Sequence, residues 1–120
     1  MTKTVVIDGK EVKLTADARL PILFRAEFPD RNFFEAIDKL TSGDIDAAVL
    51  TDFAYLMAKA ADPSSIESEE KWLEGFDDPL AMMRREGPAV DVVTLITGTA
   101  RRERGSVSPK KTEAEAVESR

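Results

Sequence analysis

The chain contains no cysteine and no histidine among its 120 residues. Without cysteine it cannot form disulfides, use a thiolate nucleophile or build a cysteine-ligated zinc site. Without histidine it lacks the side chain that most often acts as a general base near neutral pH. No apolar run approaches the roughly 20 residues of a membrane-spanning helix, and the N-terminus lacks the apolar segment of a signal peptide. We therefore expect an intracellular protein without a membrane partner.

Positive charge is also scarce, since 17 Lys and Arg residues accompany 23 Asp and Glu residues and the net charge is −6. This balance argues against a nucleic-acid partner. The whole imbalance lies between Asp62 and Asp78, where seven carboxylates accompany a single lysine, Lys71, and the rest of the chain is neutral. The glycines are scattered, and none is followed by the Lys-Ser or Lys-Thr of a phosphate-binding loop.

Carboxylates are the remaining candidates for chemistry. Asp44 and Asp46 could hold a cation, but acids also gather at helix N-termini because of the helix dipole. A second group consists of Glu67, Glu69, Glu70 and Glu74. It lacks the alternating acids and central glycine of a calcium-binding EF-hand loop, so we interpret it as a solvated acidic face. We expect no catalytic, cofactor-binding or metal-binding residue; a small metal-dependent enzyme is a third hypothesis, which divalent-ion-dependent thermal stabilisation would support.

Residues 3–14 predict a β-hairpin. Asp8-Gly9 suits a two-residue type I′ turn, which requires positive φ angles. This turn pairs Ile7 with Lys10 and places one set of apolar side chains on a single face: Val5, Ile7, Val12 and Leu14. Because two strands alone are marginally stable in water, helices must cover that face.

Residues 20–98 predict about five to six short helices. Pro21 fits the first turn of the first helix, which should end at Phe28-Pro29. The later helices should start at Asp30, Asp44, Ser65 and Asp78-Pro79. Their expected ends are Ser42-Gly43, Asp62-Pro63 and Gly87-Pro88. Helical spacing selects Phe33, Phe34, Ile37 and Leu40 in one helix, and Ile45, Val49, Phe53, Leu56 and Ala60 in the next.

These patterns predict an α+β fold, in which the hairpin packs on the helix bundle within one domain of residues 1–98. Residues 99–120 contain no large apolar side chain and are rich in Ser, Lys and Glu. Such a composition cannot offset its ordering entropy, so we expect a disordered polar tail.

Partner binding is the function class that remains. Trp72 could anchor a partner, although beside Leu73 we interpret it first as the residue that pins the acidic helix to the core. Met82 and Met83 point about 100° apart on a helix, so one should pack inside and the other can face a partner. The expected partner-binding set is completed by Val90, Val93 and Ile96. Self-association through the same helices is a further expectation.

Four segments in order resemble the phage tail assembly chaperones of long-tailed phages and prophages of Gram-positive hosts. They are IDGKEVKL, FRAEF, FAYLMAKAADPS and WLEGFDDPL, within residues 3–97. The resemblance implies a non-enzymatic protein that binds the tape measure protein, and such proteins are thought to bring tail tube (major tail) subunits. It implies action in the cytoplasm of an infected or lysogenic bacterium and absence from the mature virion. The Gly87-Pro88 interruption and the tail beyond Lys111 depart from the family pattern.

The resemblance also implies a longer form made by ribosomal frameshifting. Codons for Ser108, Pro109 and Lys110 can contain the slippery sequence C CCA AAA, and codons for Pro109, Lys110 and Lys111 can contain A AAA AAG.

An alternative from another class is a small acidic regulatory or antitoxin-like protein-binding module. A DNA-binding regulator should have a basic recognition helix. The basic clusters of this chain are Arg84-Arg85 and the arginines from Arg101 to Arg104, and the second cluster lies in the expected tail.

Overall fold

The computed structural model describes residues 1–84 and 87–107. Its elements in chain order are β1 (Thr2–Ile7), β2 (Lys10–Thr15), α1 (Leu20–Glu27), α2 (Phe33–Thr41), α3 (Ala47–Ala61), α4 (Glu69–Leu73), the 3₁₀ helix η1 (Ala81–Met83) and α5 (Ala89–Val107). One antiparallel hairpin and five α-helices in the described part confirm the predicted α+β class.

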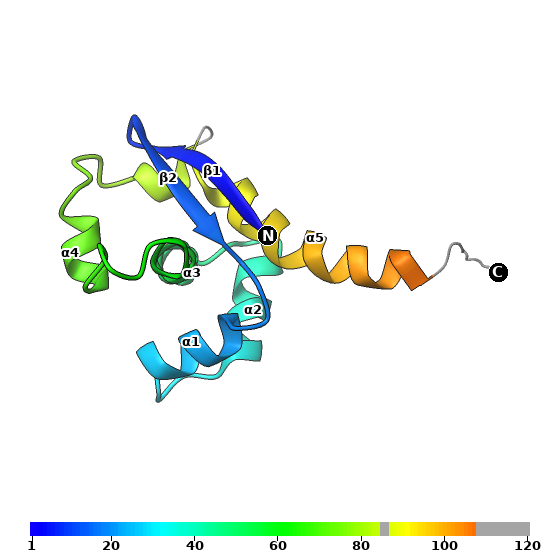
Figure 1. Ribbon diagram of the computed structural model, residues 1–120. Coiled ribbons are helices and arrows are strands. Elements are labelled where there is room, and N and C mark those ends of the chain that lie inside the picture. Colours follow the sequence, from blue (N-terminus) through cyan, green and yellow to red (C-terminus); the bar gives the residue numbers. More distant parts are fainter. Residues whose placement is uncertain (85–86, 108–120) are drawn as a thin grey trace.

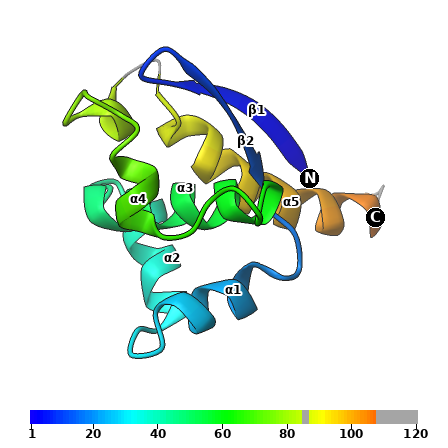
Figure 2. The same ribbon diagram turned by 60° about the vertical axis from the view of Figure 1, so that its left-hand side comes forward.

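Helix α3 lies in the middle of the fold, with the hairpin on one side and α1 and α2 on the other (Figures 1 and 2). It packs against β2, α1, α2, α4, η1 and α5. Every side chain from Phe53 to Ala58 is buried, as in a helix enclosed on all sides. The predicted spacing identified only one face, and it included Ile45, which precedes the helix.

The hairpin has the predicted register. Ile7 pairs with Lys10 and Val5 with Val12. The turn residues have φ angles of 53° at Asp8 and 77° at Gly9, as a type I′ turn requires. The side chains that the register places inward are buried, apart from the partly buried Val12, and β2 packs on α3.

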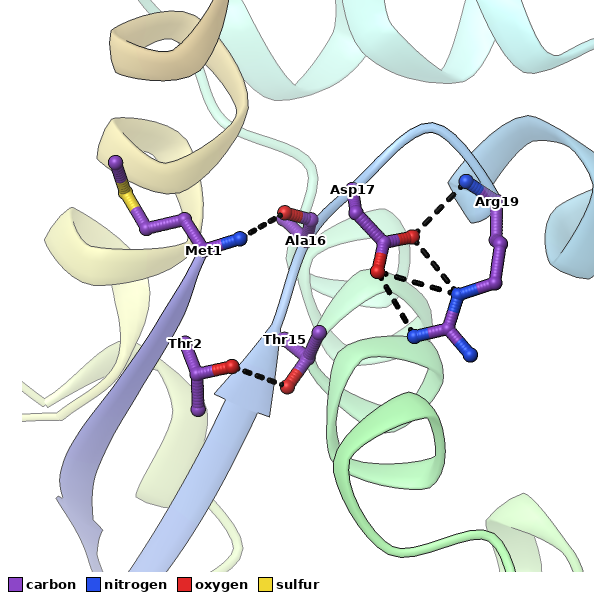
Figure 3. A network of polar contacts seen from close by, with 6 residues as sticks. All are labelled: Met1, Thr2, Thr15, Ala16, Asp17 and Arg19. Carbon is purple, nitrogen blue, oxygen red and sulfur yellow. Dashed lines mark hydrogen bonds and ion pairs between the residues drawn. The ribbon is translucent and has the colours of Figure 1, made fainter.

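The open end of the hairpin directs the chain into α1 (Figure 3). The amino group of Met1 donates a hydrogen bond to the Ala16 carbonyl over 2.9 Å. The carboxylate of Asp17 then accepts hydrogen bonds from the backbone N–H and the guanidinium of Arg19. These bonds from Arg19 lower the pKa of Asp17 to about 2. Because the Asp17–Arg19 ion pair is exposed, it contributes little to the stability of the fold. Its main effect is to orient the chain before α1.

Helix α1 has Pro21 in its first turn, as predicted, but α2, α3 and α4 start two or three residues later than predicted. The observed capping residues are Asn32, Asp46 and Ser68 in place of Asp30, Asp44 and Ser65. A capping side chain must reach the N–H groups two or three residues ahead of it. Asp46 does so by accepting from Ala48 and Val49, and several nearby Ser and Asp residues made the choice ambiguous in the sequence.

The helix ends were predicted more closely, because the capping residues just after α1, α2 and α3 are Phe28, Ser42 and Asp62. The helix predicted from Asp78-Pro79 is only the short η1. Helix α5 starts after Gly87-Pro88 and continues past the boundary expected at residue 98. Residues 99–107 include Ala, Arg and Glu, which have a high intrinsic propensity for the α-helix. The rest of the expected tail, residues 108–120, lies outside the described residues.

Replacing Leu14 by Ala should lower the free energy of unfolding by about 2–5 kcal/mol, because this fully buried side chain fills the space between β2 and α3. Val6→Ala is the matched control, since Val6 is exposed and its replacement should cost less than about 1 kcal/mol. Urea unfolding of the two variants measures both values. Equal losses would contradict this packing of the hairpin.

Candidate partner-binding surface

An apolar groove of about 300 Å³ runs beside η1. It lies between the start of α3, the end of α4 and η1 itself. Its apolar lining includes Ala47, Leu73, Phe76, Leu80, Met82 and Met83. We call this hollow the η1 groove. It combines residues from both ends of a chain segment more than thirty residues long, so only the folded chain assembles it.

The two adjacent methionines take different positions in the η1 groove. Met82 is buried, with 7% of its surface exposed, whereas Met83 is 42% exposed. This is the division predicted from the angle between neighbouring residues. Leu80, two residues before Met82, is exposed as well. The groove therefore has a buried methionine in its wall and flexible apolar side chains at its mouth.

Asp78 holds η1 in place. Its carboxylate accepts a hydrogen bond from the Leu80 N–H over 3.0 Å and two from the Arg84 guanidinium over 2.7 and 3.0 Å. Its backbone carbonyl accepts from the Ala81 N–H. The hydrogen bonds from Arg84, followed by that from Leu80, lower the pKa of Asp78 to about 2. The short helix is thus fixed at both ends although it makes only one turn.

Gly87 and Pro88 turn the chain from η1 into α5. A Cβ atom at Gly87 would lie 2.6 Å from the Ala81 carbonyl oxygen and 3.1 Å from that of Arg84. Backbone atoms cannot move aside as a flexible side chain can, so this position requires glycine. Pro88 is fully buried. The Gly87-Pro88 interruption is therefore a close packing point of the fold.

The hairpin tip fastens the loop that leads into η1. The Asp8 carboxylate accepts hydrogen bonds from the N–H groups of Asp77 and Asp78 over 2.8 and 3.4 Å. The Lys10 ammonium group donates to the Gly75 carbonyl and lies 5.7 Å from the ring centroid of Phe76, within cation–π range. Residues of the first and last thirds of the domain thus position the groove together.

The other candidate residues lie elsewhere. Trp72 is half-buried and its ring centroid is 6.2 Å from that of Tyr55 and 5.1 Å from that of Phe76, so it joins α4 to α3. Val90 is 69% exposed in the first turn of α5. Val93 and Ile96 are partly buried against the core. None of these four is part of the groove lining. Ser108 to Lys111 lie outside the described residues.

Sequence reasoning missed several residues of this surface. Leu73, Phe76 and Leu80 line the groove, and the segment WLEGFDDPL that contains them was the available signal. Helical spacing grouped Phe34 with Phe33, Ile37 and Leu40, but Phe34 is 76% exposed. Phe33 takes the inward position, and the next residue on a helix points away from it.

The acidic residues build no metal site within residues 1–84 and 87–107, where no group of three or more acids could hold an ion. Glu67, Glu70 and Glu74 are exposed, as predicted. Glu69 is partly buried, so the prediction of a fully solvated face is wrong at this position. No helix in the described part is long and apolar enough to cross a membrane.

Comparison with known proteins adds no identification. No protein-family model matches the chain, and neither a curated protein nor a solved structure matches it. A function must therefore be argued from the residues of this chain.

Met82→Asp should destabilise the domain by several kcal/mol, on the order of 3, because it places a carboxylate at a buried position without a partner. Met83→Asp should leave the melting temperature within a few degrees, since its side chain reaches solvent. Thermal unfolding followed by circular dichroism compares them. A Met83 variant that unfolds as readily as the Met82 variant would contradict this division.

Proposed function

We propose that this protein is a non-enzymatic phage tail assembly chaperone that binds the tape measure protein through the η1 groove. The observation that carries the proposal is the groove itself: it is apolar, open to solvent at Leu80 and Met83, and held in shape by hydrogen bonds around Asp78. A chaperone for a long, insoluble protein needs an exposed apolar surface, and an apolar groove can accept the side chains of a partner helix.

Two of the four segments that resemble the family, IDGKEVKL and WLEGFDDPL, contribute to the η1 groove or to the loop beside it. IDGKEVKL contains the hairpin tip that fastens the loop before η1, and FAYLMAKAADPS forms most of α3. WLEGFDDPL supplies Leu73, Phe76 and Leu80 of the groove. The position of WLEGFDDPL in the wall of the groove supports the proposal. The net charge of −6 would keep the chaperone soluble while an apolar surface is open.

A regulatory or antitoxin-like protein-binding module is the alternative, since a toxin could occupy the same groove. Neighbouring genes distinguish the two. A very long tape measure gene directly downstream supports the chaperone, whereas a lone operon with a toxin gene supports the alternative. Delivery of tail tube subunits belongs to the chaperone proposal and predicts that the tail tube protein copurifies with the chain as well.

Met83→Asp should reduce capture of a coexpressed tape measure protein at least tenfold, because a carboxylate at the groove mouth must lose its water when the partner binds. Phe34→Asp is the matched control. It places the same charge on an exposed apolar residue of α2, away from the groove, and should leave capture unchanged. Affinity copurification measures both. Equal capture by the Met83 variant and the wild type would contradict binding through the η1 groove.

The frameshifting part of the proposal is tested by the gene. The codons for Ser108 to Lys111 should contain C CCA AAA or A AAA AAG, followed by an open −1 reading frame. Expression of the gene should then yield a second, longer product with the same N-terminal domain, detectable by mass spectrometry. Codons with neither sequence, or an immediate stop in the −1 frame, would contradict it.

A further inference from the structure

Two carboxyl groups meet where α4 packs on α3. Glu69 is the first residue of α4, and its side chain lies within hydrogen-bonding reach of Asp52 on α3. The Asp52 carboxylate already accepts a 2.6 Å hydrogen bond from Arg31. The Glu69 Oε2 atom is buried and has no donor partner within the described residues. A buried carboxylate oxygen without a donor is costly, so this arrangement requires an explanation.

A proton on Glu69 explains the contact. Two ionised carboxylates that lie side by side repel each other, whereas a protonated one can donate a hydrogen bond to the other. One oxygen of the protonated Glu69 carboxyl group then acts as a donor. Burial of Glu69, followed by its hydrogen bond with Asp52, raises the pKa of Glu69 to about 8.

The other charged groups near Glu69 and Asp52 do not remove the proton from Glu69. On α1, Glu27 also disfavours an ionised Glu69 and is itself paired with Lys59 of α3 over 2.9 Å. Arg31, before α2, favours the ionised form. Its guanidinium is directed to Asp52 and lies 5.3 and 4.8 Å from the ring centroids of Phe24 and Phe28. Its position is therefore set by other contacts.

We propose that a proton shared between Glu69 and Asp52 fastens α4 to α3, and that loss of this proton releases α4. Helix α4 is only five residues long and contains no fully buried side chain. The free energy needed to open a short element with few buried contacts is small compared with the free energy of unfolding the whole domain. Besides this proton, the Trp72 ring contacts Tyr55 of α3, and Leu73 packs against the core.

The direction of the pH effect follows from the raised pKa. The folded protein holds the proton on Glu69 up to about pH 8, whereas the unfolded chain releases it near the ordinary value of 4.5. The stabilisation is therefore complete below about 4.5 and disappears as the pH rises through about 8. Docking of α4 weakens across the neutral range and is lost in mild alkali.

Release of α4 would also loosen the η1 groove, since Leu73 and Phe76 form part of its wall. This consequence rests on the proposed function, because it matters only if the groove binds a partner. The proton-dependent docking of α4 does not depend on it and can be measured on the protein alone.

Trp72 is the single tryptophan of the chain and lies on α4, so its fluorescence reports the docking of this helix. Between about pH 5 and about pH 9.5 the wild-type emission should move to longer wavelength with a midpoint near 8, as Trp72 leaves Tyr55 for water. Glu69→Gln should abolish this transition, because its amide donates to Asp52 without a titratable proton. Its melting temperature at alkaline pH should exceed that of the wild type by about 5 °C.

Glu70→Gln is the matched control, since Glu70 is the exposed neighbour on the same helix. It should retain the wild-type transition. A Glu69→Gln variant that titrates like the wild type, or a wild-type emission that stays constant over this range, would overturn the proposal. Capture of the tape measure protein is a separate readout: if the fluorescence transition is absent but Met83→Asp still blocks capture, only the proton-dependent docking is wrong.

Discussion

The burial of the middle of α3, from Phe53 to Ala58, is the constraint on which the rest of the fold depends. From Phe53 to Ala58 no side chain reaches solvent, so the helix is stable only while other elements cover all of its sides. The hairpin, α1, α2, α4, η1 and α5 each cover one part. Fully burying a large apolar side chain contributes about 1.5–3 kcal/mol, and Ala54 and Ala58 allow neighbours to approach the helix closely.

The aromatic cluster shows how one helix organises both packing and charge. Phe24 contacts Phe28, Phe33 and Phe53 with centroid distances between 5.2 and 5.6 Å, which joins α1 and α2 to α3. Asp52 precedes Phe53 and holds Arg31 over the Phe24 ring. The same carboxylate meets Glu69 from α4. A single turn of α3 thus positions three elements and creates the setting for the proposed shared proton.

The sequence predicted those features that local chemistry determines. The Asp8-Gly9 turn and the alternation of apolar residues indicated the same hairpin register, so the register was correct. Helix ends were close because Pro29 and Pro63 cannot continue the helices that precede them, and a glycine such as Gly43 is common just after a helix end. Helix starts were less accurate because several polar residues near each start can act as caps. The split between Met82 and Met83 followed from helix geometry alone.

Features set by tertiary contacts could not be predicted in the same way. The spacing within α3 identified one apolar face, whereas burial of Tyr55 and Met57 on its other sides depends on which elements arrive there. The η1 groove joins Ala47 to Leu80, residues distant in sequence. In the sequence Glu69 is indistinguishable from the neighbouring acids, because its contact with Asp52 depends on how α4 packs on α3. Local patterns therefore predict the helices and strands, whereas the groove depends on how these elements pack together.

Binding of the tape measure protein at the η1 groove is the central claim of the proposed function. Hydrogen–deuterium exchange of the chain, alone and with its purified tape measure protein, tests it most directly. The account predicts that binding slows exchange in residues 73–83 and in the first turn of α3, where the groove is formed. Slower exchange confined to α1 and α2, which carry the exposed Ile22 and Phe34, or no change in any segment, would contradict it.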